Sequence, residues 1–227
     1  MAKGDFRTAE NLPIRDIAYE TLKHAIIIGE IPAGSRIVET AYAEKMHISR
    51  TPLREAIRKL ERDGLVEYTL HKGVVVRAFT IHDIEEIFDI RNAMMMMILP
   101  SVVENVTDDD IRKLQAILDK MDVAQEKADS DALAVLNRAF HGAFEHISNR
   151  KRVLNVIDSQ EEYIIRFSAM TIASIVRRSN AHQEHHQMLQ LLRDKELERL
   201  KELMHHHLEE SKDTCLAAVT QYKSNQE

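Results

Sequence analysis

The apolar positions between residues 49 and 64 repeat with the spacing of an amphipathic helix. The positions that follow the i, i+3, i+4, i+7 pattern are Leu53, Ala56, Ile57 and Leu60. Ser49 is a favourable N-cap, and Pro52 falls in the first turn, where its missing N–H costs little. Asp63-Gly64 supplies a stop signal. The pattern therefore predicts a short helix with one face turned toward a core.

The segments around this helix predict a small domain of three helices and a hairpin. Two further helices are expected over about 17–29 and 39–45, separated by a turn at 29–34 that contains a proline and two glycines. Beyond Gly64, residues 65–68 alternate as a strand, 70–73 form a turn, and 74–76 return as a second strand. This order is typical of a winged helix-turn-helix.

In such a motif the start of the last helix reaches the base edges of DNA. Arg50 and Thr51 are at that start, and Arg54 is one turn further on, where it can meet a base or a phosphate. His71 and Lys72 are at the hairpin tip. We expect these two side chains to contact the DNA backbone or the minor groove.

From Thr80 onward the pattern is helical throughout. We predict a compact bundle of six helices: one over about 80–104, one that is capped at 107–110 and has its apolar stripe over 111–121, and four over about 130–147, 151–173, 180–193 and 196–220. The sequence thus predicts a mainly α protein of two domains, 1–79 and 80–227. The first is expected to bind DNA, and the second is expected to be an α-helical bundle.

Charge divides the chain at the same place. Residues 1–79 hold 13 Lys and Arg against 11 Asp and Glu, a net +2, whereas the remainder holds 18 against 26, a net −8. The basic part carries the motif, and the acidic part should face away from phosphate. The single cysteine, Cys215, excludes an intramolecular disulfide, and no signal peptide or membrane-length apolar run is present. We expect a cytoplasmic protein that does not associate with a membrane.

Arg91 interrupts the apolar stripe of the first bundle helix. The stripe consists of Ile84, Ile87, Phe88, Met95 and Ile98. A guanidinium in such a place needs a partner, because burying an unpaired charge costs several kcal/mol. Two interpretations follow: an ion pair with an internal carboxylate or snorkelling to the surface, or an anion receptor in a pocket.

Three of the twelve histidines share apolar helix faces. His185 lies with Met188, Leu189 and Leu192, and His207 lies with Leu200 and Leu208. His141 is one turn after Asn137, so the two side chains can converge on one point. Three inward histidines on three helices are typical of a metal site. A set of hydrogen-bonded core histidines is the alternative.

The N-terminal motifs resemble the GntR family of bacterial transcription regulators. The match runs through IxxGEIPAGSRI, SRTPLREAIRKL, DGLV and the Lys-Gly pair of the wing. The resemblance implies DNA contacts from Arg36, Arg50, Thr51, Arg54 and Gly73. Together with the helix-start and hairpin-tip positions, the predicted DNA-binding set is Arg36, Ser49, Arg50, Thr51, Arg54, His71, Lys72 and Gly73.

The C-terminal half resembles the FadR C-terminal (FCD) ligand-binding domain, in its six-helix, VanR-like form. The motifs are DIxxIFDIR, NRAFH, EHHQML and MxxHL. The resemblance implies that Arg91 faces an effector pocket. It also implies a divalent metal, Zn²⁺ or Ni²⁺, held by an Asp and three histidines, which correspond to Asn137, His141, His185 and His207.

Asn137 departs from the family pattern, because an amide oxygen is a neutral and poorer ligand than a carboxylate. An effector carboxylate or water then completes the metal shell, or the histidines bind an anion without metal. We predict effector contacts from Arg91 and Asn137.

The sequence therefore predicts a one-component transcription regulator, with repression as the expected sign. A homodimer would bind a pseudo-palindromic double-stranded DNA operator and respond to a small carboxylate or other anion. Two alternatives remain: a metalloenzyme built on the three histidines, and an architectural DNA-binding protein without an effector. Turnover of metabolites with added metal would favour the metalloenzyme. Weak DNA-sequence preference, without stabilisation by any ligand, would favour the architectural protein.

Overall fold

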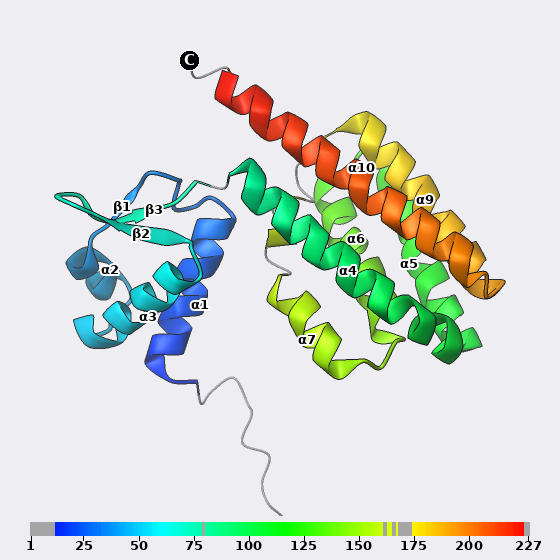
Figure 1. Cartoon of the computed structure of the whole chain (residues 1–227), viewed down its shortest axis with the longest axis horizontal. Helices are drawn as coiled ribbons and strands as arrows, with labels where there is room; N and C mark the ends of the chain where they lie inside the picture. Colours follow the sequence, from blue (N-terminus) through cyan, green and yellow to red (C-terminus); the bar gives the residue numbers. More distant parts are fainter. Residues whose placement is uncertain (1–11, 79, 161–162, 165–166, 168–173, 225–227) are drawn as a thin grey trace, which may run out of the picture. The chain divides into compact units, whose positions relative to one another are not determined.

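The computed structural model describes residues 12–78, 80–160, 163–164, 167 and 174–224 (Figure 1). The chain divides into two compact units, residues 1–79 and 80–227. The first is built from short helices and a small sheet, and the second from helices. Among the described residues, no helix combines the length and the apolar content needed to cross a membrane.

The first unit contains three helices and three short strands. In chain order they are α1 (Ile14–Ile27), β1 (Arg36–Ile37), α2 (Glu39–Lys45), α3 (Arg50–Arg62), β2 (Val66–Thr69) and β3 (Gly73–Val76). The sheet has the order β1-β3-β2, and both pairs are antiparallel. The predicted wing is therefore present, but the sequence analysis missed β1, whose two residues are too few for an alternating pattern.

Helix α3 sits where the pattern predicts it. The side chains expected on its inner face, Leu53, Ala56, Ile57 and Leu60, are all buried. The helix packs against α1, which contributes Leu22, Ile26 and Ile27 to the same core. Gly64 follows the C-cap Asp63 with a φ of +71°, a backbone conformation that glycine adopts without strain. The apolar face thus fixes α3 and leaves its polar face to solvent.

The described residues of the second unit form six helices. They are α4 (Ile81–Asn105), α5 (Asp108–Glu126), α6 (Ser130–His146), α7 (Lys151–Ser159), α9 (Ile175–Arg193) and α10 (Leu197–Ser224). Thr80 and Thr107 form capping boxes with Asp83 and Asp110, which satisfy backbone N–H groups at the starts of α4 and α5. Helix α10 packs along both α4 and α9, and α5 packs on α6 and α9 (Figure 1).

Several predicted helix boundaries differ from the structure. Helix α1 covers Ile14–Ile27 rather than about 17–29, and α10 extends to Ser224 rather than to about 220. The helix expected over 151–173 ends at Ser159, and residues 161–162, 165–166 and 168–173 lie outside the described part. That segment contains neither Gly nor Pro, so it carries no stop signal. Helix α9 begins at Ile175 rather than near 180, with the Ser174 hydroxyl accepting from the Arg177 backbone N–H. The first turn was missed because its Ile-Val pair is exposed and extends no apolar stripe.

Candidate functional site

The exposed face of α3 presents the arginines predicted to contact DNA. Arg50, Thr51 and Arg54 are all exposed, at the start and in the first turns of the helix. Ser49 occupies the N-cap position with extended backbone, but its side chain makes no capping hydrogen bond. The predicted N-cap position is therefore correct, but the Ser49 hydroxyl does not cap the helix.

Glu39, at the start of α2, joins the two arginines. Its Oε2 accepts from Arg50 Nη2 at 3.0 Å and from Arg54 Nε at 2.6 Å. Partial burial opposes ionisation of this carboxyl, but the two arginines outweigh it and lower its pKa below 4.5. One carboxylate thus holds both guanidinium groups near each other. DNA phosphates would compete with it for the same groups.

The wing brings the remaining predicted contacts to one region of the first unit. Arg36 lies in β1, and its Nε would be 3.7 Å from a Cβ added at Gly73. Gly73 has a φ of +75°, so a substitution there is strained by the backbone rather than by lack of space. His71 and Lys72 are exposed in the turn before β3.

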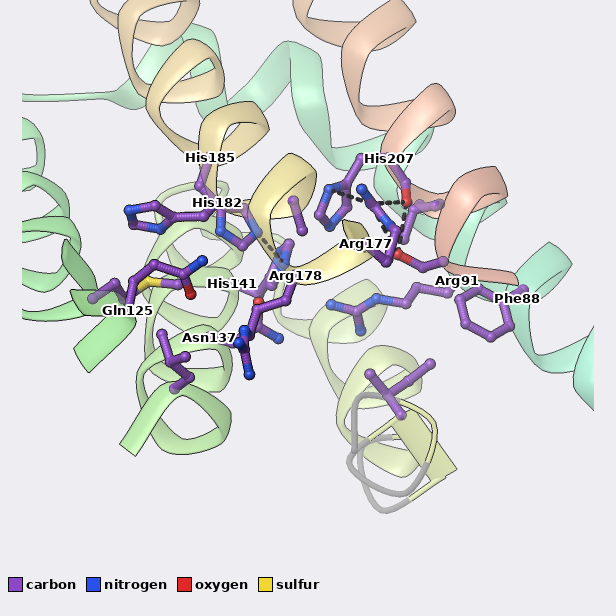
Figure 2. Close-up of a pocket in the computed structure, with 16 residues that line it drawn as sticks. Phe88, Arg91, Gln125, Asn137, His141, Arg177, Arg178, His182, His185 and His207 are labelled. Atoms are coloured by element: carbon purple, nitrogen blue, oxygen red, sulfur yellow. Dashed lines mark hydrogen bonds between the residues drawn. The ribbon is translucent and has the colours of Figure 1, made fainter. Parts of the chain in front are cut away.

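The three predicted histidines converge in the interior of the second unit. His141 comes from α6, His185 from α9 and His207 from α10, and all three are buried (Figure 2). One ring nitrogen of each lies within 4.8 Å of the others. The Nε2 atoms of His141 and His185 are 3.1 Å apart. These residues are called the inner histidine cluster below.

The inner histidine cluster is held in the neutral form. Burial lowers the pKa of His141 and His185 well below 6.5, and neighbouring positive groups act in the same direction. Burial also lowers the pKa of His207, although Glu184 opposes the shift. Neutral imidazoles are the form that binds metal ions, so binding would require little loss of protons at pH 7.

A buried ion pair orients His207. Arg177 donates to both carboxylate oxygens of Glu184, at 2.9 and 2.8 Å, and to the His207 carbonyl oxygen at 2.9 Å. Glu184 Oε2 is 2.6 Å from His207 Nδ1. Because this carboxylate is ionised, Nδ1 carries the proton and donates to it, which leaves the Nε2 lone pair available. Burial raises the pKa of Glu184, but its hydrogen bonds with His207 and Arg177 outweigh burial and lower it to about 2.

Arg91 is both half of a buried ion pair and part of a cavity wall. Its Nη2 donates to Glu145 Oε1 at 2.7 Å, and both side chains are buried. The interpretation as an internal ion pair is therefore correct, and snorkelling is excluded. Arg91 also lines two adjoining cavities, of about 60 and about 190 Å³. The two interpretations of Arg91 are compatible.

Asn137, His141 and Arg91 line both cavities, and His185, His207 and Arg177 line the smaller one (Figure 2). Asn137 is half-buried on α6, one turn before His141. The walls of the smaller cavity thus combine neutral imidazoles with guanidinium groups, whereas Glu145 and Asp158 also line the larger one. The smaller cavity therefore suits a small anion better than the larger one does, and both are below the usual size for drug-like ligands.

The donor set of the inner histidine cluster fits a divalent transition metal. Three imidazoles are ligands that Zn²⁺ and Ni²⁺ accept, and two nitrogens 3.1 Å apart are compatible with a common ion about 2.1 Å from each. Among the described residues, the Nδ1 atoms of His141 and His185 have no hydrogen-bond partner. In the part of the chain that the structure describes, His207 is therefore the one histidine of the three with the carboxylate partner that commonly orients a metal-binding histidine.

Family comparisons identify both halves of the chain. The model of the bacterial regulatory proteins of the gntR family matches residues 14–76, and the FCD domain model matches residues 86–210. The chain belongs to the GntR family and carries an FCD domain. It is a transcription regulator with a DNA-binding helix-turn-helix, and the matched domains are those of regulators rather than of a catalytic family.

Individual relatives agree with this assignment. The chain is 26% identical to the uncharacterised regulator YdhC of Bacillus subtilis, over 87% of this chain and 89% of that protein. It is 32% identical to the regulator McbR of Escherichia coli over 60% of this chain and 62% of McbR. The solved structure of E. coli McbR/YncC superposes with a TM-score of 0.67 at 26% identity and covers 94% of this chain and all of that one. The gluconate operon transcriptional repressor of Bacillus licheniformis is 27% identical over 60% of this chain and 55% of its own length.

Sequence reasoning missed the two carboxylates and one arginine that support the site of this GntR-family protein. Glu145 and Glu184 each fall next to an apolar stripe, where a carboxylate looks like an exposed flank. Arg177 fell outside the predicted helix. Only indirect signals pointed to the carboxylates. A buried Arg91 needs an acidic partner, which is Glu145, and a metal-binding histidine commonly donates to an acceptor, which is Glu184 for His207.

Proposed function

We propose that this protein is a ligand-responsive repressor that binds a pseudo-palindromic operator as a homodimer. The winged helix supplies the DNA contacts, and the FCD domain binds a small carboxylate or other anion beside a divalent metal. One observation carries the proposal: three neutral, buried histidines and Arg91 line the same cavity. Repression is supported by the names of relatives such as the gluconate operon repressor.

Regulation by the effector requires a difference in binding between two states. The ligand must bind the dimer geometry that releases DNA better than the geometry that holds it. Arg91 and the metal would both attract the anion. Its carboxylate would complete the metal shell at the position where Asn137 offers only a neutral oxygen.

A thermal-shift screen of organic acids and sugar acids, with and without Zn²⁺ or Ni²⁺, tests the proposal. A ligand at 100 times its Kd should stabilise the folded protein by about 2.7 kcal/mol, because it binds only the folded state. The same compound should release the protein from operator DNA. Stabilisation that leaves DNA binding unchanged would contradict the regulatory role.

Arg50→Ala should weaken operator binding by about 1–3 kcal/mol and relax the base preference, if the side chain contacts a guanine. Fluorescence anisotropy with operator and scrambled duplexes at fixed salt measures both effects. Lys72→Ala is the matched control for a phosphate contact. It should weaken binding to all sequences alike and reduce the salt dependence. Unchanged operator affinity in Arg50→Ala would contradict the assignment of α3 as the reading helix.

Asn137→Asp should tighten metal binding on the order of tenfold, or about 1.4 kcal/mol, because a carboxylate is the stronger ligand. It should weaken the binding of an anionic effector, since it adds a negative charge to the cavity. Competition with a chromophoric chelator measures the metal, and calorimetry measures the effector. If metal affinity did not change, residue 137 would not be a ligand.

A further inference from the structure

A second group of metal-ligating side chains lies on a different face of α9. His182 and His186 are one helical turn apart on α9, and Asp122 faces them from α5. His182 Nε2 is 2.6 Å and His186 Nε2 is 3.0 Å from the same atom, Asp122 Oδ1. One ligand atom of each residue lies within 4.8 Å of the others. These three residues are called the outer cluster.

The outer cluster shares no residue with the inner histidine cluster, although His182 also lines the smaller cavity. His185 lies between its two histidines in sequence, but neighbouring positions on a helix point about 100° apart. His185 therefore reaches His141, whereas His182 and His186 reach α5. The outer cluster is also more open: the His186 and Asp122 side chains are 38% and 46% exposed, and His182 is 13% exposed.

We propose that the outer cluster binds a second divalent transition metal ion. Two histidines at i and i+4 on one helix present their nitrogens to one ion, and the carboxylate of Asp122 on the neighbouring helix supplies a third ligand and a negative charge. Two imidazoles favour Zn²⁺, Ni²⁺, Co²⁺ or Cu²⁺ over Mg²⁺ and Ca²⁺, which prefer oxygen ligands. Exposure leaves room for water to complete the shell. Binding at the outer cluster is weaker than at a closed site with oriented ligands.

The hydrogen bonds of the outer cluster support the replacement of its two Nε2 protons by a metal ion. Asp122 Oδ1 accepts from both imidazoles, so both Nε2 atoms lie within hydrogen-bond distance of one carboxylate oxygen and need to move apart only slightly to admit an ion. A bound ion replaces the two Nε2 protons, which move to the Nδ1 atoms. The neighbouring histidines hold the pKa of Asp122 below 3.8 against the effect of its partial burial, so the carboxylate is ionised at neutral pH.

Metal counting in single variants tests the proposal. Untagged, metal-stripped full-length protein is dialysed against buffered Zn²⁺ and analysed for bound metal. His186→Ala and Asp122→Asn should each bind one ion per chain fewer than the unmodified protein. The variant with both substitutions, His186→Ala/Asp122→Asn, should also lose only one ion. His206→Ala, an exposed histidine on α10 outside both clusters, should lose none. His186→Ala is expected to fold because its side chain is partly exposed.

A variant of the inner histidine cluster separates this proposal from the proposed function. His141→Ala should also lose one ion, and His141→Ala/His186→Ala should lose two. If His186→Ala and Asp122→Asn keep the full complement of Zn²⁺, the outer site is overturned, whatever His141→Ala does. If only the outer variants lose an ion, the outer site stands and the inner metal fails. An ion at the outer cluster joins α5 to α9. Zn²⁺ should therefore also raise the Tm of His141→Ala, but not that of His141→Ala/His186→Ala.

Discussion

Arg91→Met is expected to lower the free energy of unfolding by about 3–5 kcal/mol at pH 7, because it leaves the Glu145 carboxylate buried without its partner. Urea unfolding followed by circular dichroism measures the loss. The double variant Arg91→Met/Glu145→Met removes both charges and should recover most of the stability, since an apolar pair of similar volume often replaces a buried ion pair at little cost.

The pH dependence of the single variant gives a second measurement. Burial raises the pKa of Glu145 above 4.5 even with Arg91 opposing the shift, and without Arg91 it should rise further. The loss of stability caused by Arg91→Met should therefore be smallest below about pH 4.5, where Glu145 is protonated in both the folded and the unfolded state. The difference from the unmodified protein should grow as the pH rises through the folded-state pKa of Glu145 in the variant. A single variant as stable as the unmodified protein at pH 7 would mean that the ion pair contributes nothing.

The double variant also separates the two roles of Arg91. A folded Arg91→Met/Glu145→Met protein that still binds operator DNA but no longer responds to the effector would support a direct contact between Arg91 and the anion. A full effector response in the same protein would restrict Arg91 to its structural ion pair. The single variant cannot make this distinction, because loss of folding and loss of response would coincide.

Local signals in the sequence were enough to predict α3 and the hairpin of the wing, which present all of the predicted DNA-binding side chains except that of Arg36. The stripe of α3, its proline and the Asp63-Gly64 stop act within a few residues of one another, and the helix lies where they predict it. By contrast, β1 exists because Arg36 and Ile37 pair with Val75 and Val74 of β3. A strand of two residues is specified by its partner rather than by its own pattern.

In the second unit, periodicity placed the three histidines on inner faces but could not find their supporting residues. The stripes predict only that each histidine lies in the core. The expectation that the three meet at one point came from the resemblance to the FCD domain. The partners are 23 and 54 residues away in the pairs Glu184–His207 and Arg91–Glu145. Such pairings depend on how the helices pack, and a single sequence contains no record of that. The outer cluster was missed for the same reason, because Asp122 and His182 lie on different helices.

Glu184→Gln is expected to have the second large effect, on both stability and metal binding. Glu184 has a pKa of about 2 in the folded protein against an ordinary value of 4.5. That difference corresponds to about 3 kcal/mol of stability at neutral pH, and the substitution also leaves Arg177 buried without a negative partner. Because the folded pKa is depressed, the contribution is fully present above about pH 4.5. It is lost as the pH falls toward 2, so the variant and the unmodified protein should become more alike in acid.

The same substitution should weaken metal binding at the inner histidine cluster by about 10–100-fold, since His207 loses the carboxylate that fixes its Nδ1 proton. Glu210→Gln, an exposed site on α10, makes the same chemical change away from the cluster and should alter neither property. Urea unfolding at pH 7 and pH 3, with chelator competition for Zn²⁺ at pH 7, measures both effects. Reduced stability with unchanged metal affinity would mean that Glu184 only neutralises Arg177 and does not orient a metal ligand.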